Sequence, residues 1–389
     1  MELRDALFAA LRYELTGTLP ENVSFDAIDE PFLTALYEYS NRQEVAHLVG
    51  DALEALGVLK NAPDEVAEPY RRRMAVSAYH AEQQRQVFEA VSEAFDGAKI
   101  PYLPLKGLVI RPLYPEPWMR SAGDLDILVK QEDLERAEHA LSGIGAKKGK
   151  EGEYENEFFF ATGVMVELHF RLMGKDVVNG TQKVLGEVWA HTERVDDGRF
   201  EYRMADEWFY CYFLTHAARH LQEGICGIRP FLDLWIINHR ANLDFKKCRE
   251  FLKKTRLFDF LEVAERLSEA WLSGTDEDEW TSSLEGFLLS GGVFGTTATK
   301  RLMITSGKGG KCRYYLKKLF LPFSELKQYY PILEKHRILF PFVQVYRWFR
   351  FLFGGGIGRD RKTARSAKQL DGGSRTMQEI CEHMGLSEQ

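Results

Sequence analysis

The fold is decided by seven residues, Gly123-Asp124-Leu125-Asp126-Ile127-Leu128-Val129, in which two aspartates interrupt an apolar run. A short apolar run that follows a turn residue predicts a strand of a buried sheet. Alternate side chains of a strand point to opposite faces, so Asp124 and Asp126 share one face and Leu125 lies on the other. Adjacent carboxylates repel each other, and a divalent cation that prefers oxygen ligands relieves the repulsion. The stretch therefore predicts a strand that carries a metal site.

Two kinds of periodicity alternate around this strand. Short apolar runs predict further strands over residues 102–105, 157–161 and 164–170, the last two as a hairpin turning at Thr162-Gly163. Helix-forming stretches lie between the strands, over residues 108–114 and 131–143. Residues 95–205 are therefore expected to form a small α/β core.

Both flanks of this core have helical periodicity. The last long helix before it is expected to begin at Tyr70, after Pro69, and to end near Phe95. The helical pattern returns at Asp206, and the composition after Gly354 is typical of a disordered segment. The sequence thus predicts an α+β fold with a small mixed sheet: an N-terminal helical region (1–94), the core (95–205), a C-terminal helical domain (206–353) and a flexible tail (354–389).

A third carboxylate, Glu167, lies within the expected strand 164–170, in phase with Met165 and His169. If this strand is next to that of Asp124 and Asp126, three carboxylates converge and can bridge two Mg²⁺ or Mn²⁺ ions. Such ions align an attacking hydroxyl with the α-phosphate of a nucleoside triphosphate. Because the carboxylates repel one another, neutralising either aspartate is expected to remove metal binding without lowering the stability of the metal-free fold.

Basic residues near the first strand are candidates for nucleotide binding. Lys106 and Gly107 come where that strand ends and a helix begins, so the glycine permits close backbone approach and the helix amides favour phosphate. Arg120 has two interpretations, a phosphate contact or a bidentate pair with Asp124 or Asp126.

Taken in order, these motifs are similar to those of a known family. They are Leu105-Lys106-Gly107, Leu113-Tyr114-Pro115, Arg120, the stretch 123–129 and Val166-Glu167-Leu168-His169. The chain resembles the bacterial family of uncharacterised nucleotidyltransferases in the polymerase-β-like superfamily, with looser matches at Glu44-Val45-Ala46-His47 and in the later helices. The resemblance implies a mixed sheet with helices on one side, Asp124 and Asp126 as metal ligands and Glu167 as the third carboxylate.

The function implied by the resemblance is transfer of a nucleotidyl group, AMP in the first instance, from ATP to a hydroxyl of a small molecule or protein. The acceptor-side candidates are His169, His216, His220, Arg229 and Asp233. Each has a structural alternative: His169 donating to a backbone carbonyl, His216 and His220 packing on one helix face, and Arg229 pairing with Asp233 one turn away.

Two other functions compete with this one. Lys106-Gly107-Leu108 and the long interval before Asp124 depart from the Gly-Ser or Gly-Gly turn of the superfamily, which favours a catalytically degenerate nucleotide-binding or interaction protein. A glycosyltransferase also uses a DxD pair, but it would begin with a nucleotide-binding βαβ unit, and here the beginning is helical. Ser306-Gly307-Lys308-Gly309-Gly310-Lys311 lacks phosphate-loop spacing and predicts a flexible basic loop.

The composition of the chain limits which binding partners and which cellular compartment can be expected. With 51 basic and 58 acidic residues, the chain has no overall positive charge to bind nucleic acid. Five scattered cysteines without a CxxC pair, no secretory signal and no membrane span predict a cytoplasmic protein. From Lys300 to Lys368 basic residues and aromatics interleave, which favours either weak contact with an anionic membrane surface or RNA, or aromatic packing with extended arginines.

Overall fold

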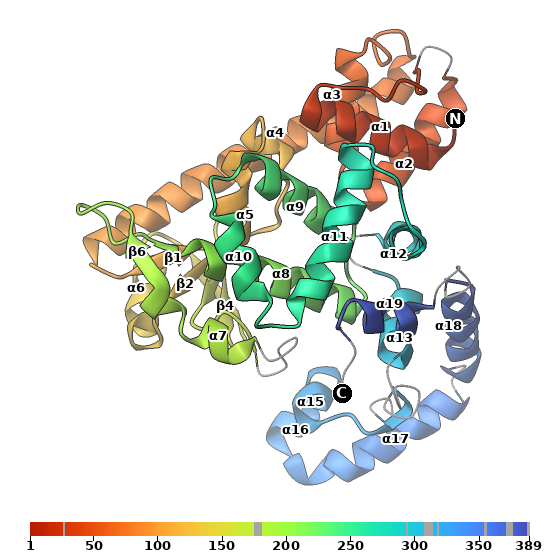
Figure 1. Ribbon diagram of the computed structural model, residues 1–389. Coiled ribbons are helices and arrows are strands. Elements are labelled where there is room, and N and C mark those ends of the chain that lie inside the picture. Colours follow the sequence, from red (N-terminus) through yellow and green to blue (C-terminus); the bar gives the residue numbers. More distant parts are fainter. Residues whose placement is uncertain are drawn as a thin grey trace. The chain divides into compact units, whose positions relative to one another are not determined.

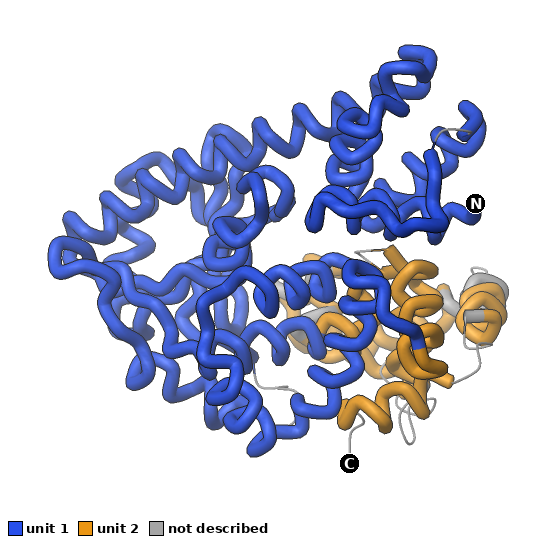
Figure 2. Tube along the Cα trace, turned by 45° about the horizontal axis from the view of Figure 1, so that its top comes forward, with its two compact units in different colours: residues 1–219, 228–277 blue, residues 220–227, 278–389 orange. Residues whose placement is uncertain are grey.

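The chain is described here by a computed structural model that covers residues 1–25, 28–174, 181–292, 295–306, 314–316, 319–353, 356–370 and 376–386. It forms two compact units, residues 1–219 with 228–277 and residues 220–227 with 278–389 (Figure 2). The first unit holds the sheet, the helices before it and several helices after it (Figure 1). The boundary between the two compact units therefore lies near residue 277, whereas the helical periodicity of the sequence predicts a domain boundary at residue 205.

A five-stranded mixed sheet lies at the centre of the first unit, with the strand order β1-β2-β5-β4-β3. The strands are β1 (Tyr102–Pro104), β2 (Asp124–Val129), β3 (Lys147–Glu151), β4 (Glu155–Phe159) and β5 (Met165–His169). β2 and β5 are parallel neighbours, and the other pairs of this sheet are antiparallel. The expected hairpin and the expected α+β class with a mixed sheet are confirmed.

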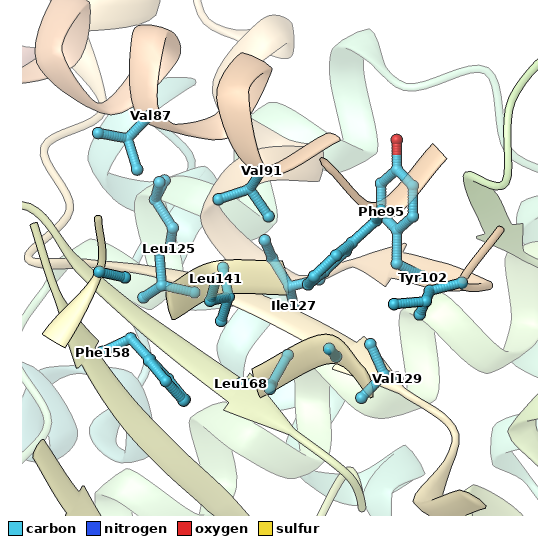
Figure 3. Packing of buried hydrophobic residues seen from close by; sticks show 14 of the residues in the cluster. Val87, Val91, Phe95, Tyr102, Leu125, Ile127, Val129, Leu141, Phe158 and Leu168 are labelled. Atoms are coloured by element: carbon cyan, nitrogen blue, oxygen red, sulfur yellow. The ribbon is translucent and has the colours of Figure 1, made fainter. Parts of the chain in front are cut away.

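One face of the sheet packs against α4 (Asp64–Gly97) and α6 (Leu134–Gly143). Figure 3 shows Val87, Val91, Phe95, Leu141 and Tyr102 gathered with side chains of β2, β4 and β5. Leu125, Ile127 and Val129 supply the β2 side of this cluster, and each is at most 1% exposed. Burying one such side chain stabilises the fold by about 1.5–3 kcal/mol. Alternation along the strand then turns Asp124 and Asp126 to the opposite face.

Short helices connect the strands, and further helices complete the first unit. The connections are α5 (Lys106–Ile110), η1 (Arg111–Leu113), η2 (Pro117–Met119), η3 (Gln131–Asp133), α7 (Gln182–Gly186) and η5 (Val188–His191). The other helices are α1 (Leu3–Thr16), α2 (Glu30–Arg42), α3 (Ala46–Ala55), α9 (Arg229–Arg240), α10 (Phe245–Leu252) and α11 (Leu257–Leu272), while α8 (Asp206–Glu223) begins here and ends in the second unit. Phe8 of α1 stacks on Trp271 of α11 at 4.5 Å, so the two ends of this unit pack together.

Helix α4 begins six residues before the start expected from Pro69. Pro69 lies inside its second turn, where it removes only the hydrogen bond that residue 69 would donate to the carbonyl of Glu65. Glu65 is exposed, so water can satisfy that carbonyl. Tertiary packing of α4 on the sheet and on α3 therefore outweighs the local preference for a break.

Three strands have no signal in the sequence. β3 is exposed along its whole length and its sequence, KKGKE, has no apolar alternation. β6 (Thr192–Arg194) and β7 (Tyr202–Met204) form a separate two-stranded antiparallel ribbon. An edge strand formed by backbone pairing alone, with charged side chains in solvent, leaves no periodic apolar pattern.

The second unit is helical in its described part. Its helices are α12 (Glu279–Gly291), α13 (Thr297–Ser306), α15 (Phe323–Tyr329), α16 (Ile332–Lys335), η6 (Arg337–Leu339), α17 (Phe340–Phe353), α18 (Gly356–Leu370) and α19 (Met377–His383). The sequence predicts a flexible tail over residues 354–389, but the structure has α18 and α19 in this segment. Helix α18 packs on α13, and Met377, Ile380 and Met384 are buried. Apolar residues at spacings of three and four give α19 a packing face that composition alone hides. Residues 307–311 of the expected basic loop lie outside the described residues.

Among the described helices, none has the length and apolar character needed to cross a membrane.

Candidate active site

The polar face of β2 and β5 carries a row of acidic side chains. Parallel pairing sets Asp126 of β2 opposite Glu167 of β5, and antiparallel pairing sets Glu157 of β4 on the other side of Glu167. Register partners lie on the same face of a sheet. The row therefore runs across three strands, with Asp124 one strand period away on β2, opposite Met165.

Asp126 lies at the centre of the charge network and is only 3% exposed. Its Oδ1 accepts a hydrogen bond from Lys106 Nζ at 2.6 Å and lies 2.9 Å from His169 Nε2. Burial acts to raise the pKa of Asp126, but the charges of Lys106 and His169 outweigh burial and hold that pKa below its ordinary range. Asp126 is therefore an ionised carboxylate that two cations neutralise.

The other two carboxylates of the predicted triad hold their protons more tightly. The charge of Asp126 is the largest cause that raises the pKa of Asp124, and burial adds to it. Burial is the largest cause that raises the pKa of Glu167, and both aspartates contribute. Like charges in one partly buried cluster favour uptake of either protons or a cation.

His169 contacts carboxylates, not the backbone carbonyl of the structural alternative. Besides Asp126, its Nε2 lies 3.6 Å from Glu167 Oε2, and its Nδ1 lies 3.3 Å from Glu155 Oε2. Burial lowers the pKa of His169, but Asp126 and Glu167 outweigh burial and raise the pKa to about 9. The imidazole is thus protonated at neutral pH and holds the acidic side chains in place.

The donor set fits a hard divalent cation. Asp126, Glu167 and His169 each offer a ligand atom, and these atoms all lie within 4.8 Å of one another. Carboxylate oxygens are the ligands preferred by Mg²⁺ and Mn²⁺. This Asp-Glu-His group shares Asp126 and Glu167 with the triad expected from sequence, and His169 can act as a ligand only in its neutral form.

Lys106 reaches the acidic row from the start of α5. Its φ of 38° is in the left-handed region, which side chains other than glycine rarely adopt. Burial disfavours its charge, but Asp126 above all raises the pKa of Lys106 well above the ordinary value. The ammonium group is therefore a fixed positive charge beside Asp126, and strained backbone aims it there.

Gly107 leaves room for the side chain of Arg120. A Cβ at this position would lie 2.7 Å from Nη1 of Arg120 and 3.6 Å from Ala122. Arg120 is 9% exposed and cannot swing into solvent to make room. The glycine thus lets the guanidinium lie directly against the first turn of α5.

The carboxylate partner of Arg120 is not one of the two aspartates expected from sequence. Its Nε and Nη2 donate to Oδ1 and Oδ2 of Asp233 at 2.9 Å each, and the hydroxyl of Tyr114 donates to the same Oδ1 at 2.9 Å. The bidentate pair exists, but its carboxylate comes from α9 and not from β2. Asp233 is 3% exposed, so this ion pair is a buried tie between the sheet loop and α9.

The remaining acceptor-side candidates, Arg229, His216 and His220, have different surroundings. Arg229 contacts Ser121 O at 3.0 Å and Glu44 Oε2 at 3.4 Å, so it is not the partner of Asp233 that its spacing suggested. Its charge also lowers the pKa of Asp124, which puts it near the acidic row. His216 lies 6.3 Å from the ring of Tyr212 on α8, while His220 falls in the second unit.

Two further residues of this site were missed. Glu155 comes from β4 opposite His169 in register, and burial raises its pKa. Tyr212 of α8 is 1% exposed, and among the described residues its hydroxyl has no hydrogen-bond partner. The alternation Glu155-Asn156-Glu157-Phe158 could have revealed Glu155 on the polar face, whereas Tyr212 had no signal beyond its helical apolar face.

The geometry gives a cluster of carboxylates on one sheet face, a fixed ammonium beside them and a donor set for a divalent cation. A family model described as an uncharacterised nucleotidyltransferase matches residues 32–273. No curated protein and no solved structure matches the chain. The matched residues make up more than half of the sequence and include the sheet, the acidic row and Asp233. The chain therefore belongs to the family of uncharacterised nucleotidyltransferases.

Proposed function

We propose that this nucleotidyltransferase moves AMP from ATP to a hydroxyl of an acceptor, with Mg²⁺ or Mn²⁺ held by Asp124, Asp126 and Glu167. The observation that carries the proposal is the parallel register of β2 and β5, which opposes Asp126 and Glu167 on the sheet face away from the core. A divalent cation bound there supplies positive charge to the triphosphate and to the attacking hydroxyl. We expect two ions, because the carboxylates extend over two positions of β2.

Lys106 has a double role in this proposal. Its ammonium lies 2.6 Å from Asp126 Oδ1 and neutralises the charge of that carboxylate. When a cation occupies the carboxylates, the ammonium is released to bind a phosphate oxygen of the nucleotide. The charge of Asp126 raises the pKa of Lys106 well above the ordinary value in the observed contact. After release, a lysine with an ordinary pKa is still charged at neutral pH.

His169 orients the ligands. Its imidazolium spans Asp126, Glu167 and Glu155, which come from three strands. A side chain held by three carboxylates keeps their oxygens directed to one point, and such positioning is the usual contribution of the protein to a metal site. In this proposal Arg229 lies on the acceptor side, and the Arg120–Asp233 pair supports α9 behind it.

The Lys106–Asp126 contact also favours the second candidate, a nucleotide-binding protein without catalysis. An internal ammonium already neutralises the central carboxylate, so the acidic row does not require a metal to be stable. In that case ATP binds, but no phosphoryl bond is broken.

Pyrophosphate release distinguishes the two. Purified protein is mixed with ATP, Mg²⁺ or Mn²⁺ and pools of hydroxyl-bearing small molecules or proteins, beside Asp126→Asn and the control Glu132→Gln, which changes an exposed carboxylate just after β2. Release that Asp126→Asn abolishes and Glu132→Gln preserves supports transfer. If calorimetry shows ATP binding but no pool gives pyrophosphate release, the non-catalytic candidate is supported. If no nucleoside triphosphate binds, both candidate functions are overturned.

A further inference from the structure

Exposed apolar side chains gather in one segment of the second unit. Among the described residues, 20 large hydrophobic side chains are exposed, and 13 of them lie between Ile304 and Phe353. A soluble domain ordinarily scatters such side chains singly, and a concentration of them marks an interaction surface. Six of the 13 belong to α17 and to η6, which directly precedes it (Figure 1).

Helix α17 presents these side chains as a stripe. Phe342, Val345, Tyr346, Phe349 and Phe353 follow one another at spacings of three, one, three and four residues, which keeps them on one helix face. Their exposed fractions are 70%, 43%, 58%, 59% and 81%. Ile338, four residues before Phe342 and 82% exposed, continues the line into η6. We call these six residues the aromatic stripe.

The other side of α17 is attached to its own unit. Gln344 is buried and donates to Leu321 O at 2.6 Å, and the indole of Trp348 donates to Leu319 O. Arg347 donates to the same carbonyl at 2.6 Å. The orientation of the helix is therefore set by hydrogen bonds on one side, and the aromatic stripe is left toward solvent.

The charge of this segment is opposite to that of the rest of the chain. Residues 300–368 contain 17 Lys and Arg but only 3 Asp and Glu, although the whole chain has a net charge of −7. Lys335, Arg337 and Arg350, which flank the aromatic stripe, are exposed. An apolar stripe flanked by cations is complementary to a surface that is both apolar and anionic.

We propose that the aromatic stripe docks on an anionic lipid bilayer, with α17 lying in the plane of the headgroups. A helix of 14 residues is about 21 Å long, shorter than the roughly 30 Å hydrocarbon core, so it lies in the interface and does not cross it. A second copy of the chain would bring two like-charged segments together, which disfavours self-association through this face. Aliphatic Ile338 and Val345 within the stripe offer no stacking surface for nucleic-acid bases, whereas acyl chains accept them.

Vesicle sedimentation with the full chain tests the proposal. Binding is compared between vesicles of phosphatidylcholine alone and vesicles of equal parts phosphatidylcholine and phosphatidylglycerol. We expect at least about tenfold stronger binding to the anionic vesicles, weakened by salt. Phe342→Ser with Phe349→Ser should reduce it by at least about tenfold, because two apolar side chains no longer enter the interface.

Two controls keep the test decisive. Tyr79→Ser removes an aromatic side chain of similar exposure (62%) on α4 and should leave vesicle binding unchanged. Lys335→Gln with Arg350→Gln changes only exposed side chains and should weaken binding to anionic vesicles without affecting folding, even if the double phenylalanine variant folds poorly. Equal binding to both vesicle types, or no binding to either, overturns the proposal. The proposal is also overturned if wild type does not bind vesicles but does self-associate or bind RNA oligonucleotides, and the phenylalanine variant loses that association.

Discussion

The guanidinium of Arg120 is held by Asp233, 113 residues later in the chain, through two hydrogen bonds of 2.9 Å. Both side chains are almost fully buried, and the hydroxyl of Tyr114 adds a third hydrogen bond to the same carboxylate. Arg120, for which the sequence left a phosphate contact and a bidentate carboxylate pair open, forms such a pair and joins the loop before β2 to α9. The position of α9, and with it of Arg229, depends on this ion pair.

Removing one partner of this pair should be costly. Arg120→Gln or Asp233→Asn leaves a buried charge without its counter-ion, and we expect a loss of about 3–5 kcal/mol in the free energy of unfolding by urea titration. Arg85→Gln, which removes an exposed ion pair with Glu82 on α4, is the control and should have little effect. If Arg120→Gln unfolds like wild type but no longer binds ATP, the arginine is a phosphate ligand after all.

Gly107→Ala should destabilise the protein by displacing Arg120. The added methyl carbon would lie 2.7 Å from Arg120 Nη1, and overpacking of this kind costs about 1–3 kcal/mol. Gly123→Ala is the matched control, because nothing lies within 4 Å of a Cβ there. Equal melting temperatures for the two variants would contradict the tight passage of the guanidinium.

The two aspartates of β2 should differ in metal-free stability, although either change to asparagine should abolish transfer. Asp124→Asn relieves repulsion by Asp126 and should raise the melting temperature in EDTA. Asp126→Asn leaves Lys106 and His169 without their counter-ion and should lower it. The sequence alone predicted no loss for either, because the cations around Asp126 were not visible. Equal melting curves for the two variants would argue against the observed ion pairs.

Tyr212→Phe should stabilise the fold and impair activity. Its buried hydroxyl has no hydrogen-bond partner among the described residues, so removing it recovers about 1–2 kcal/mol of desolvation cost. Tyr210→Phe on the same helix is the control: its hydroxyl donates to Asn238 Oδ1 at 2.8 Å, and the change should destabilise by about 1 kcal/mol. A more stable Tyr212→Phe with unchanged pyrophosphate release would indicate that the hydroxyl does not contact substrate.

His47 should make the fold sensitive to mild acid. Burial is the largest cause that lowers its pKa to about 4, against 6.5 for the unperturbed group. Between these values the unfolded chain binds a proton that the folded chain does not, so stability falls as pH falls from 6.5 to 4, by about 3 kcal/mol in all.

The measurement is the difference in unfolding free energy between wild type and His47→Gln across that pH range. Glu14, whose pKa is raised to about 8 chiefly by burial, has the opposite pH dependence, but it is common to both proteins and cancels in the difference. His139→Gln, an exposed histidine, should reproduce the wild-type curve. A difference that does not vary with pH would contradict a neutral buried His47.

Local periodicity determined which face each residue of β2 occupies. The period of two in Asp124-Leu125-Asp126-Ile127 allows one arrangement only, with leucine and isoleucine in the apolar core and both carboxylates on the opposite face. A shift by one residue would place two charges in the apolar core. The same argument predicted the hairpin of β4 and β5 and the helical character of the flanks. The family could be recognised from the same residues, since their order along the chain carries the resemblance.

Only the tertiary structure determined which strands and which charged residues are neighbours. Spacing along the chain does not say that β5 lies parallel to β2, that Lys106 contacts Asp126, or that Arg120 reaches Asp233 and not the DxD pair. The two ion pairs depend on which of several compatible charges is closest once the core has packed. They also close loops of 20 and 113 residues, and the entropic cost of loop closure is not visible in any local pattern. Edge strand β3 likewise forms because β4 offers its backbone groups, although its own side chains bury nothing.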